Sequence, residues 1–139
     1  MLIADDDQND LFFLRRAFQK SGLGHRLFEV QDGQQAVDYL SGAPPFQDRR
    51  KYPLPSLLLL DLKMPKMTGF EVLSWLKTRP DLKQMPVVVL SGSNQARDVE
   101  QARTLGAVEY HVKPADFDDL MKFVQEVDAR WLKAARNGA

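Results

Sequence analysis

Short apolar runs alternate along the chain with longer stretches in which apolar residues recur every three or four positions. Runs of the first kind are typical of buried β-strands, and the second pattern is typical of amphipathic helices. Strand and helix follow each other five times, with strands expected at residues 2–4, 26–30, 57–60, 87–90 and 108–112. This alternation predicts a parallel sheet with right-handed crossovers, which place helices on both of its faces.

The predicted helices have recognisable starting residues and inward-facing apolar stripes. Thr68 with Glu71, and Asp32 with Gln35, have the spacing of a capping box, and the last helix is expected to begin near Asp116. These stripes predict which side of each helix packs against the sheet. From the first helix to the fifth they are Leu11, Leu14 and Phe18; Ala36, Val37 and Leu40; Val72, Leu73 and Leu76; Ala96, Val99 and Ala102; and Leu120, Val124, Val127 and Trp131.

Residues 42–56 form a loop that is long for a compact domain and contains four prolines. We interpret its charged segment at residues 48–52 mainly as solvated loop, with a docking element as the alternative. The first strand is unusually short, since only three residues precede Asp5. An N-terminal truncation would explain that shortness.

Composition is that of one soluble domain: 139 residues, 44% hydrophobic and 27% charged. Nineteen basic residues balance nineteen acidic ones, so no net charge attracts the chain to nucleic acid or to an anionic membrane. The chain has no cysteine, which excludes disulfides, thiolate metal sites and thiol catalysis. Its apolar runs are shorter than the roughly 20 residues of a membrane helix, and its N-terminus does not resemble a signal peptide. We therefore expect a cytoplasmic protein.

The polar residues that directly follow the predicted strands carry the candidate chemistry. Asp5 and Asp6 follow the first strand, Asp61 the third, Ser91 the fourth and Lys113 the fifth. Because the carboxyl ends of parallel strands meet at one edge of the sheet, these groups are expected to converge.

Two or three carboxylates at one edge repel each other, and a divalent cation would offset that repulsion. The available ligands are hard oxygens, which favour magnesium or manganese over zinc. A carboxylate is already deprotonated at neutral pH and can attack phosphorus without a general base. Phosphoryl transfer then depends on positioning and on neutralising charge, for which a metal, an ammonium and a hydroxyl are suited.

At these positions the sequence resembles the response regulator receiver domain of two-component signalling, and more specifically the single-domain regulators paired with phytochrome-type histidine kinases. The matching motifs cover nearly the whole chain in the expected order. They are ADD at residues 4–6, LDLKMP at 60–65 followed by TG at 68–69, LSG at 90–92 and YHVKP at 110–114.

The resemblance implies that Asp61 is the phosphoacceptor of a magnesium-dependent reaction, with manganese as an alternative ion. Asp6 would bind the metal directly, and Asp5 either directly or through water. Lys63 would add its backbone carbonyl oxygen. Lys63 is also one of two positions at which members of the family tune the access of hydrolytic water, the other being Ser93.

The resemblance also assigns roles around the phosphoryl group. Ser91 and Lys113 would each bind one of its oxygens, and Gly92 would leave room for it. Tyr110 would change rotamer as a switch residue. The peptide bond between Lys113 and Pro114 is expected to be cis, although only about 5–6% of bonds preceding proline are cis in general.

The fold implied is a flavodoxin-like five-stranded parallel sheet in the order 2-1-3-4-5 with five helices, forming a single receiver domain over residues 1–139 without an output domain. The expected partner is a histidine kinase or phosphotransfer protein carrying phosphohistidine. A homodimer through the fourth helix, fifth strand and fifth helix is a further expectation, and no nucleic acid or membrane partner is expected. The domain would catalyse its own phosphorylation and dephosphorylation as a signalling module, not as a metabolic enzyme.

Other classes fit the same pattern less well. A flavodoxin-like small-molecule binder would need a glycine- or hydroxyl-rich phosphate loop after the first strand, where this chain has three aspartates. A magnesium-dependent phosphatase usually has a second aspartate two residues after its nucleophile, where Lys63 stands. A calcium loop beginning at Asp5 is excluded because Asp10 and Arg16 occupy its glycine and glutamate positions. A degenerate receiver that is not phosphorylated is the remaining alternative.

Overall fold

The computed structural model describes residues 1–133 and contains one parallel sheet of five strands in the order β2-β1-β3-β4-β5. Every neighbouring pair of strands is parallel. The predicted sheet and its strand order are confirmed. The strands are β1 (Leu2–Ala4), β2 (Phe28–Val30), β3 (Leu58–Leu60), β4 (Val87–Ser91) and β5 (Glu109–Val112).

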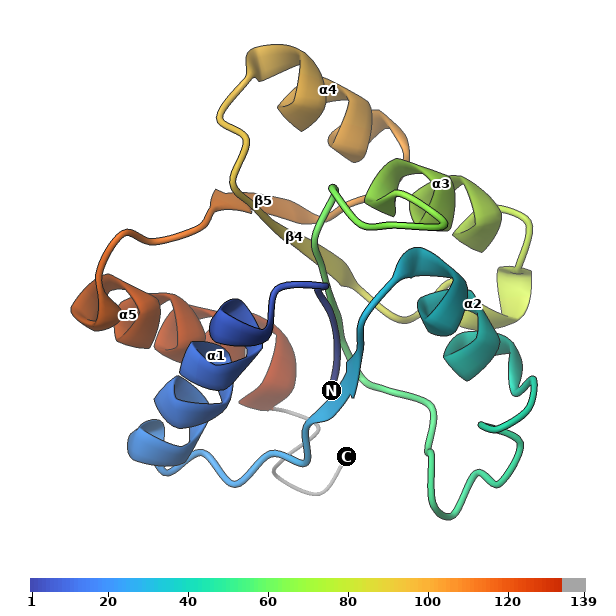
Figure 1. Cartoon of the computed structure of the whole chain (residues 1–139), viewed down its shortest axis with the longest axis horizontal. Coiled ribbons are helices and arrows are strands. Elements are labelled where there is room, and N and C mark those ends of the chain that lie inside the picture. The colour runs from blue at the N-terminus through green and yellow to red at the C-terminus, as the bar shows by residue number, and fades with distance from the viewer. Residues whose placement is uncertain (134–139) are drawn as a thin grey trace.

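Five helices cover the two faces of the sheet, as the sequence predicts. They are α1 (Gln8–Ser21), α2 (Gly33–Ser41), α3 (Gly69–Leu76), α4 (Ala96–Thr104) and α5 (Phe117–Val127). Helices α1 and α5 lie side by side on one face, while α2, α3 and α4 lie on the other (Figure 1). Within residues 1–133, no helix combines the length and apolar character needed to cross a membrane.

Successive side chains along β3 and the residue before it face opposite sides of the sheet, and each side has its own core. Leu58 and Leu60 pack with residues of α2, α3 and α4, whereas Leu57 and Leu59 pack with residues of α1 and α5. All four leucines are buried, because a central parallel strand is covered by helices on both sides. This burial fixes the position of Asp61, the next residue along the chain.

Side chains cap the helices largely as predicted. Thr68 and Glu71 form both halves of a capping box at the start of α3. The carboxylate of Asp32 accepts a hydrogen bond from the backbone N–H of Gln35 at 2.7 Å. The Gln35 side chain, however, accepts from the backbone N–H of Gln31 and not from that of the capping residue. The second half of that predicted box is therefore shifted by one residue.

Two predicted apolar stripes differ from the packing. After α5 the chain continues as a π-helix, Asp128–Leu132, whose wider turn changes which side chains face the core. Leu132 is consequently buried and Trp131 only half-buried. On α4, Ala102 is buried but Val99 is half-buried and Ala96 exposed. The first turn of α4 therefore packs less closely than its stripe predicts.

The loop of residues 42–56 is held against the end of α2. The Arg49 guanidinium donates hydrogen bonds to the carbonyl oxygens of Tyr39 (2.8 Å), Leu40 (2.9 Å) and Tyr52 (3.2 Å). The rings of Tyr39, Phe46 and Tyr52 pack against one another beside it. Arg50 in the same segment is exposed, so only part of this charged stretch is solvated as expected.

Candidate functional site

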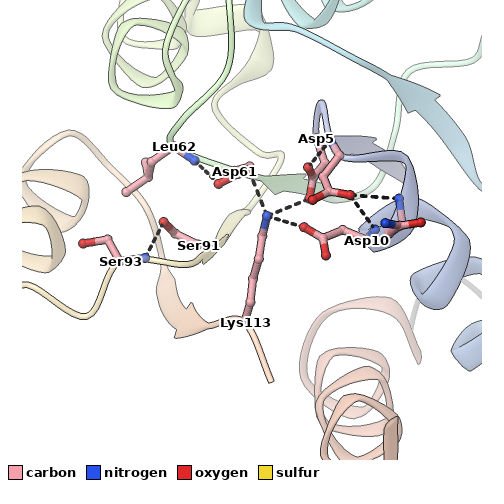
Figure 2. A network of polar contacts seen from close by, with 9 residues as sticks. Asp5, Asp10, Asp61, Leu62, Ser91, Ser93 and Lys113 are labelled. Atoms are coloured by element: carbon pink, nitrogen blue, oxygen red, sulfur yellow. Dashed lines mark hydrogen bonds and ion pairs between the residues drawn. The ribbon is translucent and has the colours of Figure 1, made fainter. Parts of the chain in front are cut away.

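Asp5 and Asp61 lie next to each other because β1 and β3 are neighbours in the sheet (Figure 2). The backbone N–H of Asp61 donates to Ala4 O at 3.0 Å, and that of Asp5 donates to Val30 O at 3.1 Å. These bonds continue the strand pairing by one residue and hold both carboxylates at the edge of the sheet. Both residues are buried, with 2% and 5% of their surfaces exposed.

The Lys113 side chain brings its ammonium group into the middle of the site (Figure 2). Its Nζ lies 3.0 Å from Asp61 Oδ2 and 3.1 Å from Asp5 Oδ2. The backbone N–H of Lys113 donates to Ser91 O at 2.8 Å, which ties the base of the side chain to β4. The predicted convergence of Asp5, Asp61 and Lys113 is confirmed.

A third carboxylate, that of Asp10, also binds Lys113, with Oδ2 at 2.6 Å from Nζ. The sequence pattern did not predict this contact. Asp10 lies in the first turn of α1, and the capping carboxylate there belongs to Asp7. The only signal in the sequence was its position in the first helical turn after the acidic end of β1.

Burial and charge shift the ionisation of this group of residues. Burial raises the pKa of Asp5 to about 6, against the opposing effects of the Asp7 backbone N–H and the Lys113 ammonium. Burial alone would lower the pKa of Lys113, but Asp10, Asp61 and Asp5 outweigh it and raise that pKa. Lys113 therefore stays protonated, whereas burial makes the Asp5 carboxyl group harder to ionise than an exposed one.

The donor set fits a divalent cation. Carboxylate oxygens of Asp5, Asp6 and Asp61 lie within 4.8 Å of one another, with Asp6 exposed to solvent. Such oxygens are the ligands preferred by magnesium and manganese. The other oxygen of Asp61, Oδ1, accepts a hydrogen bond from Leu62 N at 2.7 Å, which orients the carboxylate. Lys63 follows Leu62 and is exposed, and the role of its carbonyl oxygen stays a prediction.

Ser91 ends β4 and is fully buried, with 0% of its surface exposed. Its Oγ accepts a hydrogen bond from the backbone N–H of Ser93 at 3.2 Å, a contact drawn in Figure 2. Gly92 lies between them, and a Cβ added there would have no atom within 4 Å. Tyr110, on β5, is partly buried against the core. Its hydroxyl reaches the β4–α4 connection, where it donates a hydrogen bond to the backbone oxygen of Ser93.

The expected cis bond before Pro114 is wrong. Among residues 1–133 the Pro44–Pro45 bond is the only cis peptide, so the Lys113–Pro114 bond is trans. The trans form is intrinsically favoured by about 0.5–1 kcal/mol before proline, and tertiary contacts decide whether that preference is overturned. Here the trans bond is compatible with Lys113 reaching Asp61.

Comparison with known proteins places this geometry in a family. Residues 1–125 match the model of the response regulator receiver domain. The chain is 35% identical over 132 residues to the probable methanogenesis regulatory protein FilR2 of Methanothrix harundinacea, covering 95% of this chain and 83% of that protein. It is also 35% identical over 133 residues to the response regulator Rcp1 of Synechocystis sp., covering 96% and 88%.

Solved structures agree with the sequence matches. The Mn²⁺-bound crystal structure of Rcp1 has a TM-score of 0.84 at 35% identity, covering 95% of this chain and 93% of that one. The phosphorylated cyanobacterial phytochrome response regulator RcpA has a TM-score of 0.87 at 32% identity, covering 96% and 93%. The residues at the carboxyl edge of the sheet, the strand order and these matches lead to one conclusion: the chain belongs to the response regulator receiver domain family.

Proposed function

We propose that this domain accepts a phosphoryl group on Asp61 from the phosphohistidine of a histidine kinase or phosphotransfer protein. The proposal rests on the groups that surround the Asp61 carboxylate. One oxygen is held by the Leu62 N–H, and the other lies beside Lys113 and two further carboxylates. RcpA, a relative of the same fold, is known in a phosphorylated form.

The transfer needs a nucleophile and charge neutralisation but no general base. An Asp61 carboxylate oxygen forms the new bond to phosphorus as the bond from phosphorus to the histidine nitrogen breaks. The electron pair of that bond stays on the imidazole of the donor. Lys113 neutralises charge on the transferred oxygens, and its raised pKa supports this role because the group remains cationic.

Magnesium is the cation we assign to the acidic cluster, and it would neutralise negative charge on the transferred group. Asp6 and Asp61 would bind it directly, Asp5 directly or through water, and Lys63 through its backbone carbonyl. The closeness of the three carboxylates supports this assignment, as does the Mn²⁺-bound form of Rcp1. The same ion would serve the return reaction, in which water removes the phosphoryl group.

Ser91 and Tyr110 form the proposed switch, and Gly92 would leave room for the phosphoryl group. Ser91 would turn its hydroxyl from Ser93 toward a phosphoryl oxygen, into the space left by Gly92, and Tyr110 would change rotamer in response. Output would follow through binding of a partner to the switched surface. The partner-binding surface would be that of α4, β5 and α5, through which we also expect a homodimer.

A phytochrome-type histidine kinase is the donor that the likeness to RcpA favours. We also predict a cytoplasmic location and no nucleic acid or membrane partner. Family membership favours a signalling role over the two rival classes, a small-molecule binder and a phosphatase.

The decisive experiment is incubation with a small phosphodonor and magnesium, followed by intact-mass measurement. The wild type is expected to gain one phosphoryl group, and Asp61→Asn none. Asp118→Asn, which removes an exposed carboxylate from the first turn of α5, is the matched control and should react like the wild type. Equal labelling of Asp61→Asn and the wild type, or an unlabelled wild type, would refute the assignment.

A further inference from the structure

Lys113 is shared by three carboxylates, and these are not equivalent. Asp5 and Asp61 belong to the acidic cluster proposed to bind the cation, whereas Asp10 does not. Asp10 nevertheless makes the shortest contact, 2.6 Å from Nζ against 3.0 Å for Asp61 and 3.1 Å for Asp5. Asp10 is therefore the partner that Lys113 can keep when the other two carboxylates are engaged.

A divalent cation and the Lys113 ammonium compete for the same carboxylates. A cation bound by Asp5 and Asp61 would lie close to the ammonium, and like charges at a few ångströms repel strongly in a partly buried site. The ammonium must stay near Asp61, however, to neutralise the transferred oxygens. A separate anionic partner at the side of the cluster satisfies both requirements.

Asp10 is well placed for this role because a rigid element carries it. Leu11 and Leu14 on the same helix are buried in the core between α1 and α5. The side chain of Asp7 caps the helix and accepts a hydrogen bond from the backbone N–H of Asp10. The Asp10 side chain is 33% exposed, so it carries its charge with less loss of hydration than Asp5 at 3%. A carboxylate in the first turn of a helix is also stabilised by the helix dipole.

We propose that Asp10 is a positioning residue that holds the Lys113 ammonium when a divalent cation displaces it from Asp5 and Asp61. The site can then bind a metal ion while the Lys113 ammonium stays near Asp61. The inference rests on the proposed function, because it assumes that the cluster binds a cation. It adds a residue that acts through Lys113 without touching the metal or the phosphoryl group.

The test measures Mn²⁺ binding without any phosphodonor. The protein is titrated with Mn²⁺, and the concentration of free ion is measured by electron paramagnetic resonance. Asp10→Asn keeps the shape and polarity of the side chain while removing its charge. It is expected to weaken Mn²⁺ binding by about three- to tenfold, which lies in the lower part of the range of coupling between residues in contact. Asp118→Asn, the exposed first-turn control on α5, should leave the affinity unchanged.

A double-mutant cycle separates action through Lys113 from a direct effect of charge. Lys113→Gln removes the competing ammonium and should tighten Mn²⁺ binding. In that background, adding Asp10→Asn should change the affinity by less than about twofold. An Asp10→Asn effect of equal size in both backgrounds, or no effect in the wild-type background, would overturn the proposal.

A structure of the metal-bound wild type provides a test that needs no variant. Lys113 Nζ should remain within hydrogen-bonding distance of Asp10 and should have moved away from Asp5. An ammonium still bound to Asp5, with Asp10 turned away, would contradict the inference. Failure of the wild type to bind Mn²⁺ at all would instead contradict the proposed metal site, so the two failures are distinguishable.

Discussion

The hydroxyl of Tyr110 donates a hydrogen bond to the backbone oxygen of Ser93 at 2.8 Å. The other polar groups of Ser93 are also engaged: its N–H donates to Ser91 Oγ and its hydroxyl to Asp98 on α4. One residue of the β4–α4 connection thus joins the proposed phosphoryl-binding serine, the proposed switch tyrosine and the start of α4. Turning the Ser91 hydroxyl toward Asp61 would break its bond with Ser93 and so disturb the acceptor of Tyr110.

Removing the Tyr110 hydroxyl should test this connection. Tyr110→Phe keeps the ring that packs on the core but loses the bond to Ser93, so unfolding free energy should fall by about 1 kcal/mol. Combining it with Ser91→Ala should give a non-additive loss, because both changes act on Ser93. Urea denaturation of the two single variants and the double variant measures the coupling. Strict additivity would show that Ser93 does not link the two residues.

Gly69 stands where the chain after Asp61 passes close to the start of α3. A Cβ added there would lie 2.4 Å from Asp61 O and 2.8 Å from Leu62 Cα, both backbone atoms. Gly69→Ala should therefore destabilise the domain by about 1–3 kcal/mol and displace the acceptor, with slower phosphorylation. Thermal unfolding and phosphodonor labelling measure the two effects, and a fully stable Gly69→Ala protein would argue against this close approach.

Gly92→Ala is the matched substitution at a position with open space around it. Its unfolding free energy should stay within about 0.5 kcal/mol of the wild type. If Gly92 leaves room for the phosphoryl group, labelling by a small phosphodonor should nevertheless slow. Unchanged labelling of a stable variant would remove Gly92 from the site.

Arg49 and Arg50 are neighbours with different environments. Arg49 donates to three backbone carbonyl oxygens at the end of α2 and in the following loop, whereas Arg50 is exposed. Arg49→Ala removes these three hydrogen bonds and should reduce unfolding free energy by about 1–3 kcal/mol. Arg50→Ala should change it by less than about 0.5 kcal/mol. Urea denaturation measures both variants. Similar losses of unfolding free energy would mean that the removed positive charge, and not the lost hydrogen bonds to the carbonyl oxygens, reduces the stability.

Glu109, on β5, should make the stability of the domain depend on pH in the acidic range. Burial alone would raise its pKa, but hydrogen bonds from His111 and Trp131 and the charge of Arg130 outweigh burial and lower the pKa below 4.5. A carboxyl group with a lowered pKa in the folded state contributes stability at higher pH. That contribution is lost as the pH falls through the pKa of the folded state.

The comparison is between Glu109→Gln and the wild type, with unfolding free energy measured from neutral pH down to about pH 3. The wild type should lose more stability below pH 4.5 than the variant, because only the wild type has this carboxylate to protonate. Glu126→Gln, at an exposed position of α5, should follow the wild type. Parallel curves for Glu109→Gln and the wild type would contradict the prediction.

Local sequence was sufficient to predict the sheet, because runs such as residues 57–60 are buried on both faces and allow few other structures. The convergence of Asp5, Asp61 and Lys113 followed from topology, since parallel strands bring their carboxyl ends to one edge. Thr68 and Glu71 marked a helix start through a purely local pattern of hydrogen bonds. In each case the determining interactions lie within a few residues or follow from the strand order.

Other features depend on contacts between residues far apart in the chain. Asp10 and Lys113 are separated by 103 positions, and no periodicity relates them. Leu132, in place of Trp131, is buried in the core that includes residues of β1 and α1, a long-range packing that the periodicity of the last helix does not predict. The sequence by itself thus determined which groups reach the edge of the sheet. Only the tertiary structure decided which of them touch, because contact at hydrogen-bonding distance depends on how helices pack and not on where strands end.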